Sequence, residues 1–182
     1  MIAKKLDIDF GGTMSDNEYV PDWNPENNSL QSTLHPDPNW NGHLERQPFP
    51  GCLETLRLLR EKGFSHGVVS RIEMDRLLIQ VKIRRWFTHH GFDEVIPQEL
   101  IRFCQTWEGK VILCEMRGTT HFIDNHLAPL APMVERIPNL YLFRPDRERG
   151  TNKYLWHLVE SGKVTLVQSW SEFCEHVLRK DK

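Results

Sequence analysis

The chain has 182 residues, of which 39% are hydrophobic and 26% are charged, and its formal net charge at pH 7 is -2. These values are typical of one soluble globular domain over residues 1–182. The charge excludes the chain-wide cationic excess of a general nucleic-acid binder. No window holds the roughly 20 apolar residues that a membrane-spanning helix needs. We therefore expect neither a nucleic-acid partner nor association with a membrane.

Two further features bear on the compartment. The N-terminus lacks the apolar core, about 7–15 residues long, of a secretory signal peptide. The four cysteines form no Cys-x-x-Cys pair, so we expect neither a disulfide framework nor a zinc knuckle. Together they predict a cytoplasmic protein, and they leave its oligomeric state open.

The first predicted element is a short buried strand over residues 2–10, which runs directly into Gly11 and Gly12. Residues 17–50 then form an irregular insert that is rich in proline and asparagine and contains Trp23 and Trp40. Such a long structureless loop is unusual in a compact domain unless it is functional, and its tryptophans favour packing against the rest of the chain. We expect the insert to form a small lid over the carboxyl edge of the sheet.

Beyond the insert, helical and extended segments alternate. Apolar residues at helical spacing predict a helix over 51–63, and residues 65–70 form the next strand. The next segment is predicted as a helix of about four turns, ended by His90-Gly91, with a wide apolar face made of Met74, Leu77, Leu78, Ile79, Val81, Ile83, Trp86 and Phe87. The later elements are an extended piece at 100–103, a helix at 108–116 ended by Gly118, a strand at 120–124, a helical segment at 127–134, strands at 139–143 and 164–168, and a last helix that begins at Ser169 with Glu172 in a capping-box pattern.

Strands that alternate with helices require parallel crossover connections. The predicted fold class is therefore α/β, a three-layer sandwich around a mostly parallel sheet.

Four polar motifs follow predicted strands or begin a predicted helix. They are Asp9-Phe-Gly-Gly-Thr13, Ser70, Lys110 and Ile123-Asp124-Asn125. Open α/β sheets bind their ligands at the carboxyl ends of the strands, so we expect the four motifs to lie together. A carboxylate in such a place can attack phosphorus if the charge of the transferring group is neutralised. Two carboxylates with a backbone carbonyl also suit Mg²⁺.

In order and placement, these motifs resemble those of the haloacid dehalogenase (HAD) superfamily. The similarity covers roughly residues 1–145 and extends to the last strand and helix. It implies a Rossmann-like core with a minimal lid insert instead of a full cap domain. It also implies a Mg²⁺-dependent, phosphatase-like hydrolase that acts on a phosphorylated small molecule.

The same resemblance assigns roles to individual residues. Asp9 is the nucleophile that forms an aspartyl-phosphate, and Lys110 is the catalytic cation, which also binds phosphate. The remaining phosphate ligands are Gly12, Thr13 and Ser70, and the metal ligands are Asp9, the Gly11 carbonyl and Asp124.

The first motif departs from the family at Gly11, where most of its phosphatases carry a second Asp that protonates the leaving oxygen. General acid–base catalysis contributes about 10²–10⁴-fold, so the loss predicts a slow enzyme, a substitute acid or different chemistry. Histidine titrates near neutral pH, which makes His35, His43, His121 and His126 the candidate acids. In the fourth motif, Asn125 replaces the usual second acid and lowers the negative charge at the metal.

Two other functions stay open beside the hydrolase. One is a catalytically degenerate member of the family that binds a phosphorylated ligand or a protein partner without turnover, which the glycine at position 11 favours. The other is a dehalogenase-type hydrolase of carbon–halogen bonds. Asp124 argues against the latter, because that chemistry needs no metal-binding acid. Retention of Asp9, Thr13, Ser70, Lys110 and Asp124 favours the phosphohydrolase.

Overall fold

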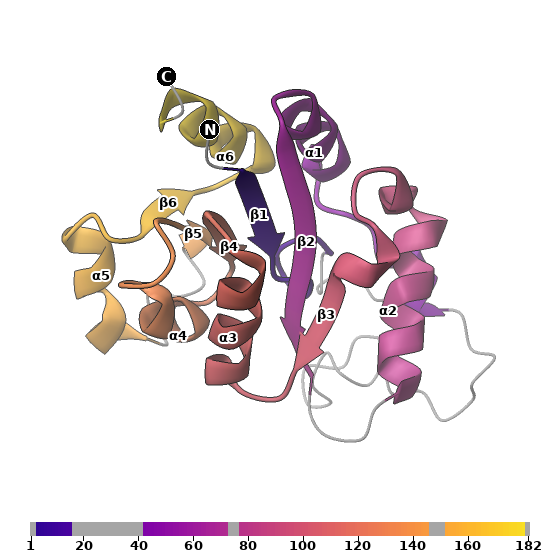
Figure 1. Cartoon of the computed structure of the whole chain (residues 1–182), viewed down its shortest axis with the longest axis horizontal. Coiled ribbons are helices and arrows are strands. Elements are labelled where there is room, and N and C mark those ends of the chain that lie inside the picture. Colours follow the sequence, from indigo (N-terminus) through magenta and orange to yellow (C-terminus); the bar gives the residue numbers. More distant parts are fainter. Residues whose placement is uncertain (1–2, 16–41, 73–76, 146–151, 181–182) are drawn as a thin grey trace.

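A computed structural model describes residues 3–15, 42–72, 77–145 and 152–180. Its centre is a six-stranded sheet in the order β3-β2-β1-β4-β5-β6 (Figure 1). All pairs of neighbouring strands are parallel. The strands are β1 (Lys4–Ile8), β2 (Phe64–Arg71), β3 (Ile101–Cys104), β4 (His121–Asp124), β5 (Asn139–Phe143) and β6 (Thr165–Val167). The predicted mostly parallel sheet is thus confirmed.

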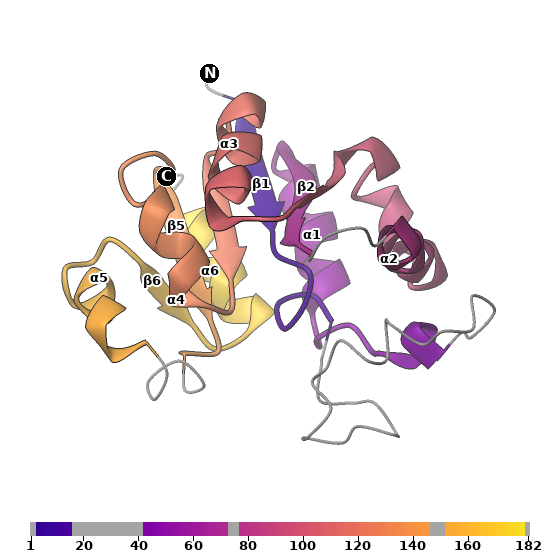
Figure 2. The same ribbon diagram turned by 90° about the horizontal axis from the view of Figure 1, so that it is seen from below.

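Helices cover both faces of this sheet, and Figure 2 shows α3 on one side of the strands with α1 and α6 on the other. The first layer contains α1 (Cys52–Glu61), α2 (Leu77–His89) and α6 (Trp170–Lys180). The second contains α3 (Trp107–Arg117), α4 (Leu127–Leu130) and α5 (His157–Glu160). A separate apolar core lies under each layer, so the three-layer sandwich is confirmed.

The helix ends agree with the signals in the sequence. Gly118 ends α3 with φ 69. The Ser169 hydroxyl accepts a hydrogen bond from the Glu172 N–H at 3.1 Å, and the Glu172 carboxylate accepts one from the Gln168 N–H at 2.7 Å. The capping box at the start of α6 is therefore present, except that Glu172 reaches one residue further back than the standard pattern does. The segment predicted as one helix over 127–134 is α4 followed by a 3₁₀ turn, Ala131–Met133.

The apolar face predicted for α2 was partly wrong. Leu77, Leu78 and Val81 are 72%, 38% and 45% exposed. Met74 lies outside the described residues. The rest of the predicted face, Ile79, Ile83, Trp86 and Phe87, is buried as expected, together with Lys82. Because the helix is apolar around much of its circumference, periodicity alone did not identify which side meets the sheet.

A buried ion-pair network joins the middle of β1 to α3. The Asp7 carboxylate accepts hydrogen bonds from Arg117 at 2.9 Å, from Arg102 at 3.1 Å and from the Thr119 hydroxyl. Gly67 on the neighbouring strand leaves the room for this carboxylate, because a β-carbon there would collide with Asp7 Oδ1. These contacts hold the end of α3 against β1, two residues before Asp9.

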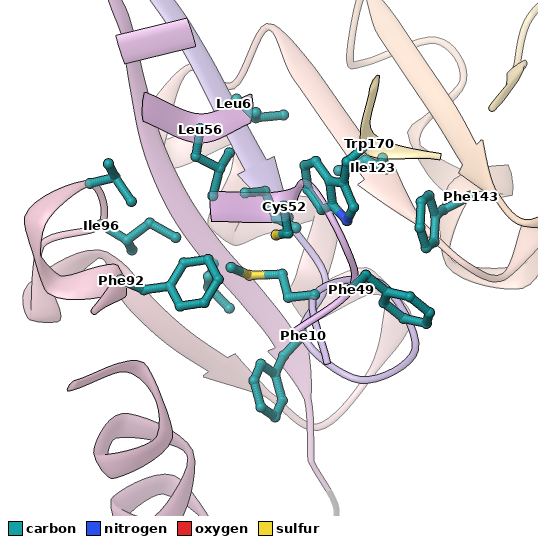
Figure 3. Packing of buried hydrophobic residues seen from close by; sticks show 14 of the residues in the cluster. Leu6, Phe10, Phe49, Cys52, Leu56, Phe92, Ile96, Ile123, Phe143 and Trp170 are labelled. Atoms are coloured by element: carbon teal, nitrogen blue, oxygen red, sulfur yellow. The ribbon is translucent and has the colours of Figure 1, made fainter. Parts of the chain in front are cut away.

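The end of the insert is tied to the core. The Phe49 N–H donates to the Met14 carbonyl at 2.8 Å, and the Phe49 ring packs edge-on against Phe143 (Figure 3). The indole of Trp86 donates to the Arg46 carbonyl at 2.7 Å. The predicted lid falls mainly on residues 16–41, including Trp23, His35 and Trp40, which lie outside the described residues.

Two predictions about the whole chain can be compared with the fold. All four cysteines are free thiols, as the absence of paired spacing indicated. Within the described ranges, no helix is both long and apolar enough to cross a membrane.

Candidate active site

Two carboxylates meet at the carboxyl edge of the sheet because β1 and β4 are neighbours. Ile8 pairs with Ile123, and the Asp9 N–H donates to the Ile123 carbonyl at 3.0 Å. Asp9 directly follows β1, and Asp124 is the last residue of β4. The shared edge that the sequence predicted for these two residues therefore follows from parallel pairing.

Lys110 connects the two carboxylates. Its ammonium donates to Asp9 Oδ1 at 2.8 Å and to Asp124 Oδ2 at 2.7 Å. The side chain comes from the first turn of α3, which begins where the Thr106 hydroxyl accepts the Gly109 N–H at 2.9 Å. Since both oxygens contact one nitrogen, they are separated by at most the sum of these lengths. We call Asp9, Lys110 and Asp124 the carboxylate–lysine cluster.

Burial controls the electrostatics of this cluster. Lys110 and Asp124 are each 1% exposed, and Asp9 is 8% exposed. Burial raises the pKa of Asp9, against the opposing effect of Lys110 and with a further increase from Asp124. Burial by itself would lower the pKa of Lys110, but the carboxylates of Asp124 and Asp9 outweigh it and raise the pKa above the usual value. Lys110 therefore stays positively charged at neutral pH and stabilises negative charge rather than donating a proton.

The loop after β4 packs tightly on the loop after β1. The second oxygen of Asp124 accepts the His126 N–H at 2.9 Å, and the Thr13 hydroxyl donates to Asn125 Oδ1 at 3.3 Å. Gly12 has φ 82, and a β-carbon on it would lie 2.5 Å from Asn125 Nδ2. Asn125 thus holds the loop after β1 in place. The sequence indicated only that Asn125 replaces a metal-binding acid and did not predict this role.

Thr13 has a second anchor that the sequence did not indicate. Its carbonyl accepts the indole N–H of Trp170 at 3.1 Å, although the two residues are far apart in the sequence. Trp170 is the first residue of α6, and it is fully buried. In the sequence, a tryptophan directly after the capping residue Ser169 indicates only that the start of the helix is buried. The hydrogen bond from Trp170 to the Thr13 carbonyl could therefore not be predicted.

The predicted phosphate ligands are placed unequally. Thr13 is fully buried against Asn125, and Ser70 is buried near the end of β2, the other neighbour of β1. Within the described residues, the Ser70 hydroxyl joins none of the hydrogen bonds of the carboxylate–lysine cluster. The Gly12 N–H already donates to the Ser15 carbonyl at 3.0 Å. It is therefore not available to an anion in this arrangement.

The backbone of Gly11 fits the role predicted for it. Of the two loop glycines it is Gly12 that has the positive φ. Among the described residues, the Gly11 carbonyl accepts no backbone hydrogen bond, and the N–H groups of Gly11 and Thr13 donate none. Within the described part of the chain, the backbone therefore leaves the Gly11 carbonyl open to a cation and these two N–H groups open to an anion.

The four candidate histidines are not equivalent. His126 is exposed and directly follows Asn125. His121 begins β4, and its ring lies against Phe64 and Tyr141. It is three residues before Asp124, which is about 10 Å along a strand, so its ring lies at the wrong end of β4 for proton transfer at the carboxylate–lysine cluster. His35 and the side chain of His43 lie outside the described residues.

Comparison with solved structures identifies the fold. D,D-heptose 1,7-bisphosphate phosphatase from B. bronchiseptica, solved with magnesium and phosphate, aligns with a TM-score of 0.59 at 13% identity over 97% of this chain and 99% of its own. A haloacid dehalogenase-like hydrolase from Burkholderia xenovorans LB400 aligns at 0.61 and 15% identity over 95% and 98%. A HAD-superfamily hydrolase from Ehrlichia chaffeensis aligns at 0.60 and 10% identity over 98% and 97%.

Neither a family model nor a curated protein sequence matches the chain. The structural similarity nevertheless extends over nearly the whole length of both partners in each comparison. The chain therefore has a HAD-like fold, as the motifs predicted.

Proposed function

We propose that this chain is a Mg²⁺-dependent phosphohydrolase that acts on a phosphorylated small molecule through an aspartyl-phosphate at Asp9. The observation that supports this most directly is Lys110 between Asp9 and Asp124 at the carboxyl edge of a HAD-like sheet. A buried ammonium that bridges two carboxylates neutralises charge at the place where a phosphoryl group would add more. Three similar folds at low identity support the same conclusion, because the proteins that have them are named as a phosphatase and two hydrolases.

The chain's own groups can be placed in the reaction as follows. An Asp9 carboxylate oxygen attacks phosphorus and forms the acyl phosphate, while the leaving oxygen departs with the bonding electron pair. Lys110 stabilises the equatorial oxygens by its fixed charge. The Ser70 hydroxyl and the N–H groups of Gly11 and Thr13 are the proposed hydrogen-bond donors to the phosphoryl group, while the Thr13 hydroxyl donates to Asn125 and holds the loop. Water then attacks the phosphorus of the acyl phosphate, which breaks the bond to the Asp9 oxygen, releases inorganic phosphate with a proton lost to solvent, and regenerates the Asp9 carboxylate.

The donor set fits Mg²⁺ better than a softer metal. Asp9, Asp124 and the Gly11 carbonyl would hold the ion, and the rest of an octahedral shell would be water and a phosphate oxygen. Within the described residues, no group of three or more His, Cys, Asp or Glu side chains gathers as a Zn²⁺ site would require. When bound, the ion would add positive charge opposite Lys110 and orient the phosphoryl group.

Gly11 sets the limit of the proposed chemistry. With no carboxylic acid at this position, and with Lys110 held in its charged form, the leaving oxygen must carry its own negative charge or receive a proton from another group. Of the candidate proton donors, His126 is the one closest in sequence to the cluster, two residues after Asp124. We therefore propose that good leaving groups are turned over best.

The test is hydrolysis of para-nitrophenyl phosphate by the purified protein, with Mg²⁺ and with EDTA in its place. Turnover should require the ion, and Asp9→Asn should reduce it by roughly 10³-fold or more. Asp93→Asn is the matched control, because Asp93 is an exposed carboxylate beyond the far end of α2 and should leave the rate unchanged. Turnover that survives Asp9→Asn would show that the nucleophile has been assigned wrongly.

Gly11 also favours a second candidate function, which is binding of a phosphorylated ligand or protein without turnover. In that case no phosphate ester would be hydrolysed, yet adding inorganic phosphate to the protein in Mg²⁺ would raise the melting temperature above that in Mg²⁺ alone for the wild type and not for Lys110→Met. The pair of measurements separates the two functions.

A further inference from the structure

Arg71 brings a second positive charge to the same edge of the sheet. It is the last residue of β2, directly after Ser70. The pairing of β1 with β2 ends at Ile8 and Val68, so Arg71 lies beyond it, at the carboxyl edge of the sheet. Successive side chains of a strand alternate between the two faces of the sheet, and Val69 packs in the core under α3. Arg71, two residues later, therefore projects on the α3 side. Asp9 projects on the same side, because its carboxylate contacts Lys110 of α3.

Trp107 holds the Arg71 side chain. The guanidinium carbon lies 4.1 Å from the centre of the Trp107 ring. The Lys110 nitrogen lies 5.8 Å from the centre of the same ring, so the two cationic groups are separated by at most the sum of these two distances. Trp107 is the first residue of α3, and the Thr106 cap fixes its backbone. Arg71 is thereby positioned relative to the carboxylate–lysine cluster rather than free to sample the solvent.

Among the described residues, the position of Arg71 over the Trp107 ring leaves its hydrogen-bonding capacity unused. Stacking occupies the flat face of the guanidinium, while its N–H donors point outward in the plane of the group. Arg71 is exposed, and no carboxylate among the described residues pairs with it. Arg102 and Arg117, by contrast, are paired with Asp7. A fork of N–H donors in this state suits bidentate contact with a carboxylate or a phosphate.

We propose that Arg71, positioned by Trp107, binds a second anionic group of the substrate. The substrate class is then a small phosphorylated molecule that also carries a carboxylate or another phosphate. This rests on the proposed function, which places the first phosphoryl group at Asp9 and Lys110. Trp107 is a positioning residue in this arrangement.

The test compares the binding of non-hydrolysable probes by calorimetry in Mg²⁺. Methylphosphonate carries one anionic group, whereas 3-phosphonopropionate and ethylene-1,2-bisphosphonate carry two with the same carbon spacing. At least one of the two-anion probes should bind the wild type about tenfold or more tightly than methylphosphonate does. The better of the two shows whether a carboxylate or a phosphate is preferred.

Variants assign this preference to Arg71. Arg71→Gln should reduce the preference for the two-anion probe to about twofold or less. Arg71→Lys, which keeps the charge and loses the fork, should retain part of it. Trp107→Leu should also lose most of it, because the guanidinium is no longer held. Arg60→Gln is the matched control, since Arg60 is exposed near the end of α1, before β2 begins at the opposite edge.

The possible outcomes distinguish a failure of the proposed role of Arg71 from a failure of the proposed function. Equal affinities for one-anion and two-anion probes, or a preference that persists in Arg71→Gln, overturn the role of Arg71 alone. A wild-type protein that binds none of the three probes overturns both. Loss of methylphosphonate binding in Lys110→Met supports the proposed site independently of Arg71.

Discussion

Gly12 lies so close to Asn125 that a β-carbon at position 12 would come within 2.5 Å of the Asn125 side-chain nitrogen. The contact joins the loop after β1 to the loop after β4, the two segments that carry Asp9 and Asp124. The requirement for glycine is therefore both conformational, with φ 82, and steric.

The first prediction concerns this contact. Gly12→Ala should lower the free energy of unfolding by about 2–4 kcal/mol, since it adds strain at positive φ to the displacement of Asn125. Gly63→Ala is the matched control. Gly63 has φ 87, but nothing lies within 4 Å of the place that a β-carbon would take, so only the backbone cost of about 1 kcal/mol applies. Urea denaturation measures both, and equal losses would contradict a role for Asn125.

The second prediction concerns the charge of Lys110. Lys110→Met leaves two buried carboxylates without their counter-charge and should cost about 3–5 kcal/mol of unfolding free energy in EDTA. Mg²⁺ should restore more stability to this variant than to the wild type. Lys163→Met is the control, because the pair that Lys163 forms with Glu135 is exposed and contributes little. A small effect of Lys110→Met in EDTA would argue against a charged cluster.

The third prediction concerns leaving groups. Aryl phosphates and acyl phosphates should be hydrolysed far faster than sugar or serine phosphates, since the acid contribution of about 3–5 kcal/mol is missing at Gly11. Gly11→Asp should narrow this gap, because the positive φ of the loop belongs to Gly12. Similar wild-type rates on alkyl and aryl esters would instead reveal a substitute acid. Single His→Ala changes at His35, His43 and His126 would then identify the substitute acid. His121→Ala is the control and should leave the rates unchanged.

The fourth prediction concerns pH. Burial lowers the pKa of His66 from 6.5 to about 4, while its Nε2 contacts the Leu56 carbonyl at 2.8 Å. The unfolded chain therefore binds a proton at His66 that the folded chain does not between these pH values. Stability contributed by neutral His66 is fully present above pH 6.5 and is lost as pH falls towards 4, by about 3 kcal/mol in total. His66→Gln should flatten the stability curve over this window, and parallel curves for the two proteins would contradict the assignment.

The sequence alone was sufficient for the fold class and for the location of the cluster. Hydrophobic runs that alternate with helical periodicity require parallel crossovers, and parallel strands end at one edge, so Asp9 and Asp124 had to lie at the same edge, while the contact between them depends on β1 and β4 being neighbours. Lys110 was assigned through the resemblance to the HAD motifs, and the first turn of α3 places it at that edge. Local signals also determined the ends of α3 and α6, since a glycine or a capping serine acts on its own neighbours.

The tertiary structure decided what depends on contacts between distant segments. Periodicity could not determine which side of α2 is buried, because that helix is apolar around much of its surface. Asn125 against Gly12, Trp170 on the Thr13 carbonyl, and Arg71 on Trp107 each join residues with no pattern in common. His121 belongs to the same group, because its position beside Asp124 in the sequence becomes a separation of about 10 Å once the segment is an extended strand.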